Sequence, residues 1–189
     1  MKNISKAVIA LGIVAGIGAG SEVLASNVGA AVSSTTDISV SISEVLGITS
    51  SVSAVSGTLT NGGDITELRP VSGDAGFNVV TNHSSGYTVS IKGSGNCTGS
   101  GVDASALCND TDDIIPAGVV AKGTSAWSYK GGNKSSYAAI TAAGETIFSA
   151  DGPTTDAGTT TKVQYFATAS SSQAAGTYVG QATYTVAAK

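Results

Sequence analysis

The 189-residue chain is poor in charged, aromatic and histidine side chains. Charged residues make up 12% of the sequence, about half of what a soluble globular domain usually contains. This composition argues against a helical cytosolic enzyme, which would be rich in Glu, Lys, Leu and Ala. The net charge is −4, and the Lys and Arg residues are scattered singly. Nucleic-acid binding is therefore not expected, because it requires clustered cations that face phosphates.

Residue types that carry out catalysis are also scarce. The only histidine, His83, falls in a predicted turn, and the sequence contains no G-x-S-x-G motif. A hydrolytic triad needs a base beside its nucleophile, and a zinc site needs several His or Cys ligands. Glu145 and Asp151 could be nominated as the carboxylate pair of a glycosidase, but nothing in the sequence pairs them. We therefore expect no enzyme and no cofactor, and we keep a secreted hydrolase with an acidic site as a third hypothesis.

The N-terminus has the pattern of a secretory signal peptide. Lys2 and Lys6 precede Ala7–Gly20, an uncharged apolar stretch that is too short and too rich in glycine for a spanning helix. The pattern predicts removal of residues 1–25 and a mature start at Ser26. An uncleaved membrane anchor or a pilin-type assembly helix is the alternative. We expect a secreted, cell-surface protein that meets a membrane only through this segment.

Two cysteines, Cys97 and Cys108, are present. An oxidising compartment favours joining them, and closing so short a loop stabilises the fold by roughly 2–3 kcal/mol in the chain-entropy model. The alternative is a redox or nucleophilic cysteine, which would lack both a C-x-x-C spacing and a nearby base. The sequence therefore predicts a structural disulfide.

An acidic group follows the second cysteine. Asp110, Asp112 and Asp113 could converge in a loop and bind Ca²⁺ through their oxygens. The EF-hand pattern is absent, however, because no Gly and late Glu occupy the required offsets. A solvated acidic loop is the favoured interpretation, and no metal is expected.

Apolar and small polar residues alternate along much of the chain, and this period of two predicts short strands. The cleanest alternation is Asp37–Ser43 (D-I-S-V-S-I-S), in which Ile38, Val40 and Ile42 share one face. Strands are also predicted in the following segments: Glu44–Ser53, Ile65–Val71, Phe77–Thr81, Tyr87–Lys92, Ser125–Lys130, Tyr137–Ile140, Thr146–Ser149, Lys162–Ser170 and Tyr178–Ala188. Such spacing is typical of an all-β, antiparallel β-sandwich of the Ig-like or pilin-like kind. We expect it to span residues 37–189 as one domain, after a flexible leader at 26–36.

Two strand pairings follow from proximity in the sequence. Phe77–Thr81 and Tyr87–Lys92 are expected to form an antiparallel hairpin, and Lys162–Ser170 and Tyr178–Ala188 are expected to form the hairpin that closes the fold. In the last strand one set of alternate residues should face the core, namely Tyr178, Ala182, Tyr184 and Val186.

The aromatic pair Trp127 and Tyr129 lies on one side of a predicted strand. Exposed, the two rings would form a platform for a sugar. A lone Trp in a sandwich more often belongs to the core, and we favour that placement.

Two short stretches resemble a known class of proteins. Ala175–Val186 (A-G-T-Y-V-G-Q-A-T-Y-T-V) resembles the closing strand of secreted bacterial fimbrial, pilin-like and spore-coat-type β-sandwich subunits, and Val79–Val89 (V-V-T-N-H-S-S-G-Y-T-V) resembles a hairpin in small exported surface proteins of bacteria. The resemblance implies a structural, polymerising or adhesive role. The cysteine positions depart from the usual early pilin disulfide.

An extended segment can add as a strand to the exposed edge of a sheet. The candidate donor is Asp37–Ser43, with Ile38, Val40 and Ile42 filling a groove in the next subunit. Alternatively, the same residues form the first strand of their own domain. We expect a self-associating cell-surface subunit of a pilus-like or surface-layer polymer; the alternative is a monomeric secreted adhesin that binds a host or neighbour-cell glycan or protein.

Overall fold

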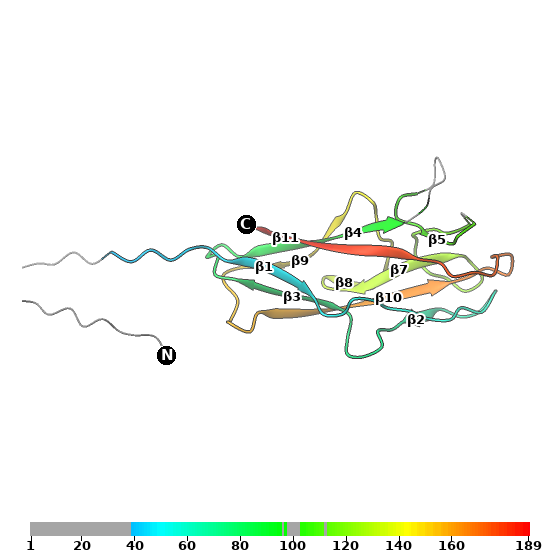
Figure 1. Ribbon diagram of the computed structural model, residues 1–189, viewed down its shortest axis with the longest axis horizontal. Coiled ribbons are helices and arrows are strands. Elements are labelled where there is room, and N and C mark those ends of the chain that lie inside the picture. The colour runs from blue at the N-terminus through cyan, green and yellow to red at the C-terminus, as the bar shows by residue number, and fades with distance from the viewer. Residues whose placement is uncertain (1–38, 96, 98–102, 112) are drawn as a thin grey trace, which may run out of the picture. The chain divides into compact units, whose positions relative to one another are not determined.

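The computed structural model describes residues 39–95, 97, 103–111 and 113–189, which fold into strands, turns and loops without a helix (Figure 1). The predicted signal peptide and leader, with Asp37 and Ile38, lie outside the described residues. The strands are β1 Leu46–Ser50, β2 Thr66–Leu68, β3 Gly76–Thr81, β4 Tyr87–Gly95, β5 Leu107–Cys108, β6 Ile114–Ile115, β7 Ala126–Gly131, β8 Lys134–Ala138, β9 Glu145–Ala150, β10 Thr159–Thr168 and β11 Gly180–Ala188. All pairings between these strands are antiparallel, which confirms the all-β antiparallel prediction.

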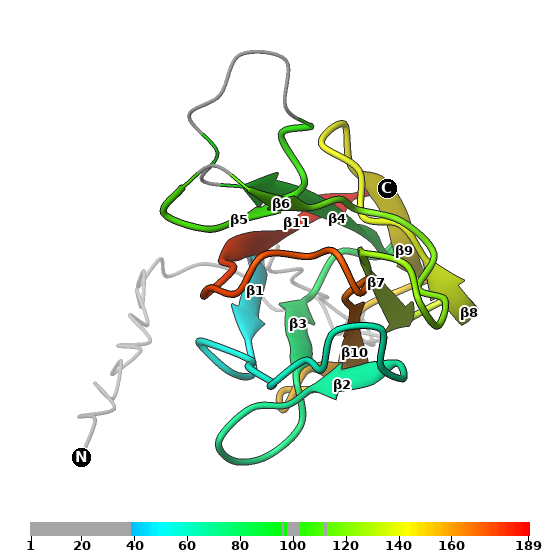
Figure 2. The same cartoon turned by 90° about the vertical axis from the view of Figure 1, so that its right-hand side faces the viewer.

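The strands of Ser41–Lys189, which form one unit, are arranged in three sheets. The largest has the order β1-β3-β10-β7-β8, with β2 also paired to β10, and the second has the order β11-β4-β9. β5 and β6 form a small third sheet. β10 connects much of the large sheet, because Thr159–Lys162 pair with β3 and Val163–Thr168 pair with β7 (Figures 1 and 2).

The predicted hairpin of Phe77–Thr81 and Tyr87–Lys92 is wrong, although both segments are strands. β3 pairs with β1 and β10, whereas β4 pairs with β11 and β9. The turn between them carries the chain from one sheet to the other, so that Phe77 and Val79 on β3 and Val89 on β4 are all fully buried. β3 and β4 therefore meet through the packing of these side chains between the sheets, and they do not hydrogen-bond to each other.

The predicted closing hairpin is wrong for the same reason. β10 belongs to the large sheet, and β11 pairs with β4 over its whole length, from Gly180 opposite Gly95 to Ala188 opposite Tyr87. The predicted inward face of the last strand is correct, since its alternate residues pack against the core while their neighbours are exposed. The apolar pattern therefore indicated the buried face correctly but not the partner strand.

The main core lies between the two larger sheets. Phe77 of β3 contacts Tyr184 of β11, with ring centroids 5.0 Å apart, and Phe148 of β9 at 6.2 Å. The other buried members come from both sheets and include Tyr87, Ile91, Tyr129, Ile147, Val163 and Tyr165. The core is thus more aromatic than the low overall aromatic content suggests.

The segment before β1 forms no strand over residues 39–45. Val40 and Ile42 are 79% and 83% exposed. The interpretation of Asp37–Ser43 as the first strand of its own domain is therefore wrong for the described residues 39–43. The first strand is β1, within the predicted Glu44–Ser53.

Candidate functional site

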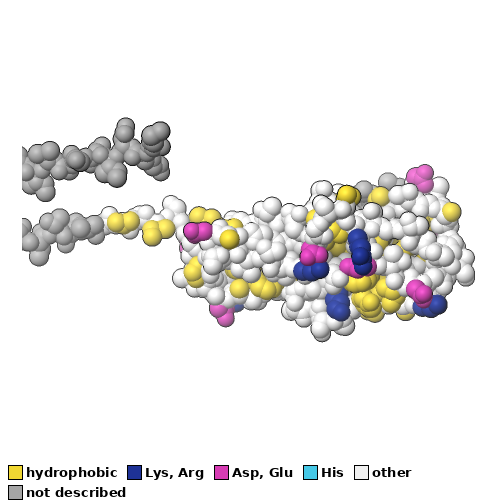
Figure 3. Space-filling model, turned by 90° about the horizontal axis from the view of Figure 1, so that it is seen from below, with side chains coloured by type: hydrophobic (Ala, Val, Ile, Leu, Met, Phe, Trp, Pro, Cys, Tyr) yellow, Lys and Arg dark blue, Asp and Glu magenta, His cyan; other side chains and the backbone are white. Residues whose placement is uncertain are grey.

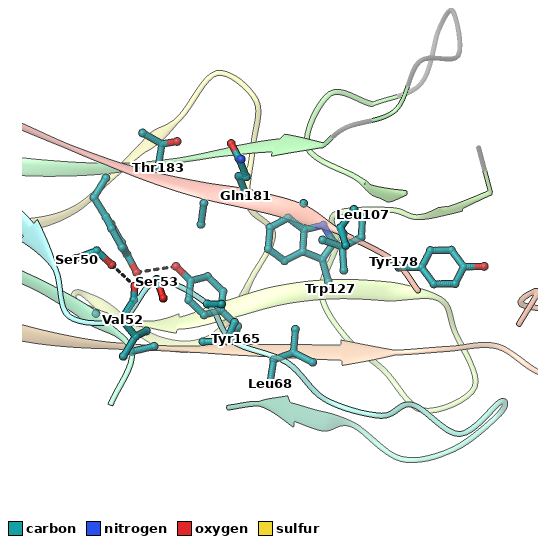
Figure 4. Close-up of a pocket in the computed structure, with 18 residues that line it drawn as sticks. Ser50, Val52, Ser53, Leu68, Leu107, Trp127, Tyr165, Tyr178, Gln181 and Thr183 are labelled. Atoms are coloured by element: carbon teal, nitrogen blue, oxygen red, sulfur yellow. Dashed lines mark hydrogen bonds between the residues drawn. The ribbon is translucent and has the colours of Figure 1, made fainter. Parts of the chain in front are cut away.

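A groove of about 550 Å³ opens between the edge strands of the two larger sheets (Figure 4). β1 and β11 are these edges, and they are neighbours along part of their length. Ser50 at the end of β1 and Val52–Val55 after it form one wall of the groove, and Tyr178–Tyr184 forms the other. We call this feature the edge groove.

The floor of the edge groove is apolar and comes from several strands. Leu68 of β2, Leu107 of β5, Trp127 of β7 and Tyr165 of β10 line it (Figure 4). The Trp127 indole is only 3% exposed, and its Nε1 donates a hydrogen bond to the Ser105 carbonyl at 2.9 Å. The polar atom of the indole is thereby satisfied, and the rest of the floor offers apolar surface.

β11 has small residues on its inner face along the groove. Gly180 and Ala182 stand between the large inward residues Tyr178 and Tyr184. A Cβ atom on Gly180 would lie 2.7 Å from Leu107 Cδ2, so a larger residue there would displace Leu107. Leu107 of the groove floor therefore occupies the space in front of Gly180.

The outer edge of β11 has no partner strand among the described residues. On its inner side, Val179 N and O exchange hydrogen bonds with Cys108 at 2.9 Å, and Lys189 N donates to Gly86 O at 3.1 Å. Backbone groups alternate in direction along an antiparallel strand. The N–H and C=O groups of the even-numbered residues Gly180, Ala182 and Tyr184 therefore point away from β4, toward the groove.

A pair of tyrosines connects the two sheets at the inner end of the groove. The hydroxyl oxygens of Tyr165 on β10 and Tyr184 on β11 are 2.6 Å apart (Figure 4). Burial raises the pKa of Tyr184 to about 12 and raises that of Tyr165 as well. Both hydroxyls are therefore neutral at physiological pH, as a mutual hydrogen bond requires.

The side chain of Asn82 holds the segment that leads into β1. Its Nδ2 donates to Ser43 O at 2.8 Å, and its Oδ1 accepts from Val45 N at 2.7 Å. The neighbouring His83 places Nε2 at 3.7 Å from Glu44 Oε1. Asn82 lies in the connection between β3 and β4. Asn side chains commonly form hydrogen bonds with backbone groups. Nothing in the sequence indicates, however, that Asn82 reaches the backbone of Ser43 and Val45.

Trp127 and Tyr129 are buried, so an exposed platform made of these two rings is excluded and the favoured core placement is confirmed. Tyr129 donates to Glu145 Oε1 at 2.5 Å, and Glu145 Oε2 lies 2.6 Å from Lys134 Nζ. Asp151, the other carboxylate once nominated with Glu145, pairs with Lys189. Glu145 and Asp151 are thus each paired with a different lysine.

The Cys97–Cys108 disulfide is present, with the two Cα atoms 5.4 Å apart, and this confirms the prediction. It adjoins the backbone pairing of Cys108 with Val179, at the start of the groove wall. The disulfide therefore helps to fix that end of the edge groove.

The acidic group does not converge on a metal in the part of the chain described. Asp113 Oδ2 accepts hydrogen bonds from Tyr178 at 2.6 Å and Gln173 at 2.9 Å, and the bond from Tyr178 lowers the pKa of Asp113. Asp110 is exposed, and Asp112 lies outside the described residues. Within these limits, no group of three or more His, Cys, Asp or Glu residues could hold a metal ion.

The molecular surface in Figure 3 is mostly uncharged, and its Lys, Arg, Asp and Glu side chains are scattered over it. The ion pairs Lys162–Asp74 and Lys122–Asp64, both with a nitrogen–oxygen distance of 2.7 Å, are exposed. The residues described include no helix that is long and apolar enough to cross a membrane.

Together these features define an all-β protein with an apolar groove beside a free sheet edge. Comparison of the chain with family models, with curated proteins and with solved structures finds no match. The groove and the exposed segment before β1 are the features of the described residues that bear on function.

Proposed function

We propose that this chain is a structural subunit of a secreted, cell-surface fibre with a pilin-like β-sandwich fold, and that it is not an enzyme. Residues 37–43 of one copy add as a strand to the edge groove of the next copy. The observation that carries the proposal is the coexistence in one chain of an exposed alternating segment and an unpaired sheet edge beside an apolar groove.

The segment and the groove match in length and in pattern. The groove wall Tyr178–Tyr184 and the segment Asp37–Ser43 each contain seven residues, or about 20 Å of extended chain. In a strand, Val40 and Ile42 would enter the groove and the intervening serines would face solvent. Burying each apolar side chain contributes about 1.5–3 kcal/mol, and the backbone of the added strand satisfies the free edge of β11.

A subunit cannot fill its own groove with this segment. Asn82 holds Ser43 and Val45 at the start of β1, whereas the groove begins at Ser50, where β1 ends. Ser50 lies seven positions after Ser43 in the sequence, up to about 23 Å along an extended chain. Ile42 is one residue from Ser43 and cannot cover that distance while β1 pairs with β3. The proposed occupant therefore comes from another copy.

Ser43, at the end of the donor segment, and the groove wall at Tyr178 lie toward opposite ends of the unit Ser41–Lys189, which favours a linear fibre. Ser43 lies beside Asn82, at the same end as the C-terminus in Figure 1, while Tyr178 lies just before β11 at the other end. Contacts between different surfaces of identical subunits repeat without closing unless a rotation brings the ends together. The disulfide is compatible with an oxidising location outside the cytoplasm.

The proposal is tested with a negatively charged donor face and a matched control. Val40→Asp combined with Ile42→Asp places two carboxylates in the groove, and burying unpaired charge is strongly unfavourable. Ser39→Asp combined with Ser41→Asp adds the same charges on the face expected to point to solvent. We expect the first variant to remain monomeric and the second to form fibres in electron microscopy and sedimentation.

Both variants should unfold at the same urea concentration as the parent chain, because the changed residues are exposed in the free subunit. Fibre formation by the Val40→Asp, Ile42→Asp variant at the parent level would overturn the proposal. A parent chain that stays monomeric would favour the alternative, a monomeric adhesin.

A further inference from the structure

We infer that Asn133, in the turn between β7 and β8, is an N-glycosylation site. The acceptor pattern for this modification is Asn-X-Ser or Asn-X-Thr, where X is not proline. The pattern begins at Asn3, within the predicted signal peptide, and at Asn82, Asn96, Asn109 and Asn133. Because such short matches arise by chance in a chain rich in Ser and Thr, the surroundings of each Asn decide between them. The inference rests on the secretion that forms part of the proposed function, but it does not depend on strand addition.

Asn133 offers its side chain to solvent from a backbone that is held in place. Its backbone N–H donates to Ile147 O at 2.7 Å, which fixes the turn against β9. The side chain is exposed, and its Nδ2 donates to Thr146 O at 3.4 Å, beyond the distance of about 2.7–3.2 Å that is usual for such bonds. A glycan attached to Nδ2 would therefore project from the surface with no short hydrogen bond lost.

The hydroxyl of this acceptor pattern is accessible as well. Ser135 lies in β8, and its side chain is exposed. β8 is an edge strand, with β7 as its one partner among the described residues. An edge strand presents unpaired backbone groups through which a protein can bind an extended segment. A transferring enzyme can thus reach the Asn133 amide, the Ser135 hydroxyl and the backbone between them.

Asn109 has the opposite surroundings, since it is only 8% exposed. Its Oδ1 accepts hydrogen bonds from Thr111 N at 3.1 Å, from Thr111 Oγ1 at 3.0 Å and from Asp113 N at 2.8 Å. The hydroxyl of this acceptor pattern is therefore turned back onto the asparagine. A glycan is bulky and belongs on the surface, so we expect Asn109 to remain unmodified.

Asn82 is exposed, but its amide is already engaged. Nδ2 donates to Ser43 O at 2.8 Å, and Oδ1 accepts from Val45 N at 2.7 Å. A glycan on Nδ2 would compete for space with the backbone that this nitrogen contacts, which makes Asn82 a poorer acceptor than Asn133. Asn96 lies outside the described residues.

The transfer needs a co-reactant, which is a glycan linked to a lipid through phosphate. The bond between the anomeric carbon of the glycan and a phosphate oxygen breaks, and the lipid phosphate leaves with the electron pair. The same carbon forms a bond to Asn133 Nδ2, which gives up one proton to a base of the transferring enzyme. Asn133 thus remains an amide that keeps one N–H and carries the glycan.

The position of Asn133 leaves the edge groove open. β8 and β1 are the two ends of the strand order in the large sheet, and Figure 2 shows them on opposite sides. The groove lies beside β1 and β11. A glycan at the start of β8 is therefore compatible with assembly through the groove.

Mass spectrometry of the protein from its natural source tests the inference. Chymotrypsin cleaves after aromatic residues, so Asn133 falls in the peptide Lys130–Tyr137 and Asn82 falls in Asn78–Tyr87. We expect a glycan mass on Lys130–Tyr137, placed on Asn133 by electron-transfer fragmentation, and an unmodified Asn78–Tyr87. A glycan on a serine of Lys130–Tyr137 instead, or a secreted protein without a glycan at Asn133, would overturn the inference and leave the proposed function standing.

Two serine variants of the full-length chain, produced in the same source cells, provide a matched comparison. Ser135→Ala removes the hydroxyl of the acceptor pattern, and Ser136→Ala removes a neighbouring exposed hydroxyl that the pattern does not include. We expect Ser135→Ala to lower the occupancy of Asn133 by about tenfold or more and Ser136→Ala to leave it unchanged. Equal occupancy in the two variants would count against the inference. A parent chain that stays in the cytoplasm without a glycan would overturn the inference together with the secretion on which it rests.

Discussion

Asn82 Oδ1 accepts a hydrogen bond from Val45 N at 2.7 Å, across a separation of 37 residues in the sequence. The same side chain donates to Ser43 O at 2.8 Å, so that one amide holds the backbone on both sides of Glu44. This contact marks where the exposed segment ends and the folded unit begins. It also determines how far Ile42 lies from the edge groove of its own subunit.

Replacing Asn82 with Ala should loosen the start of β1. Two side-chain hydrogen bonds are lost, each with a net value of about 0.5–1.5 kcal/mol, but solvent can partly replace them because Asn82 is exposed. We expect faster amide exchange at Ser43–Leu46 and a loss of about 1 kcal/mol in the free energy of unfolding. Asn133→Ala, at an exposed turn, is the control. Unchanged exchange at Val45 would contradict the assigned role of Asn82.

Replacing Tyr184 with Phe should destabilise the fold, because the hydroxyl of Tyr165 then loses its partner in the core. A buried polar group left without a partner costs about 1–3 kcal/mol, and we expect a loss of this size in urea unfolding. The double variant Tyr165→Phe, Tyr184→Phe removes both hydroxyls and should lose less than the sum of the single changes. Additive losses would show that the two hydroxyls do not interact.

Stability should fall as the pH rises through the range in which Tyr184 ionises. The folded-state pKa of Tyr184 is raised to about 12, above the value of about 10 for an unfolded tyrosine. Between these values the folded state binds more protons than the unfolded state, so the free energy of unfolding falls with pH. The contribution of the protonated Tyr184 hydroxyl to the free energy of unfolding is present in full below a pH of about 10. Tyr184→Phe should flatten this fall, and an unchanged slope in that variant would contradict the assignment.

Replacing both cysteines with Ser should weaken the start of the groove wall. The disulfide closes a loop with a sequence separation of 11, and its loss costs about 2–3 kcal/mol in the chain-entropy model. We expect this loss in the free energy of unfolding, together with faster amide exchange at Val179. The parent chain under reducing conditions should behave in the same way. Equal stability of the oxidised parent and the double Ser variant would contradict the prediction.

Filling the edge groove from within should block assembly. Ala182→Leu adds a larger apolar side chain to the half-buried inner face of β11, beside the open space. We expect sedimentation to show loss of fibres with no loss of monomer stability. Thr183→Leu places the same side chain on the exposed face and should assemble normally. Equal assembly of the two variants would show that this part of the groove is not occupied in the fibre.

Most of the longer strands and their buried faces could be predicted from alternation, whereas the two-residue strands β5 and β6 were not predicted. Val89 and Ile91 in β4, and Ala182, Tyr184 and Val186 in β11, face the core as their period of two requires. Alternation reports which side of a strand is apolar, and burial of apolar area depends on that property alone. The disulfide could also be predicted, because only one pairing of two cysteines exists.

The partners of the strands could not be predicted in the same way. A strand that turns back into its own sheet and a strand that crosses to the opposite sheet have the same apolar pattern, so β3 with β4 and β10 with β11 were both expected as hairpins. The choice depends on packing across the core, such as Phe77 against Tyr184 at 5.0 Å. These contacts join residues that are distant in the sequence.

The sequence by itself determined the all-β class, the buried faces, the disulfide and the alternating segment at Asp37–Ser43, because each depends on local pattern or residue count. Only the tertiary structure decided that Trp127 is in the core, that Asn82 holds Ser43 and Val45, and that a groove lies beside Gly180 and Ala182. These features arise where strands far apart in the chain meet, and side-chain volume and backbone direction at those meeting points decide them.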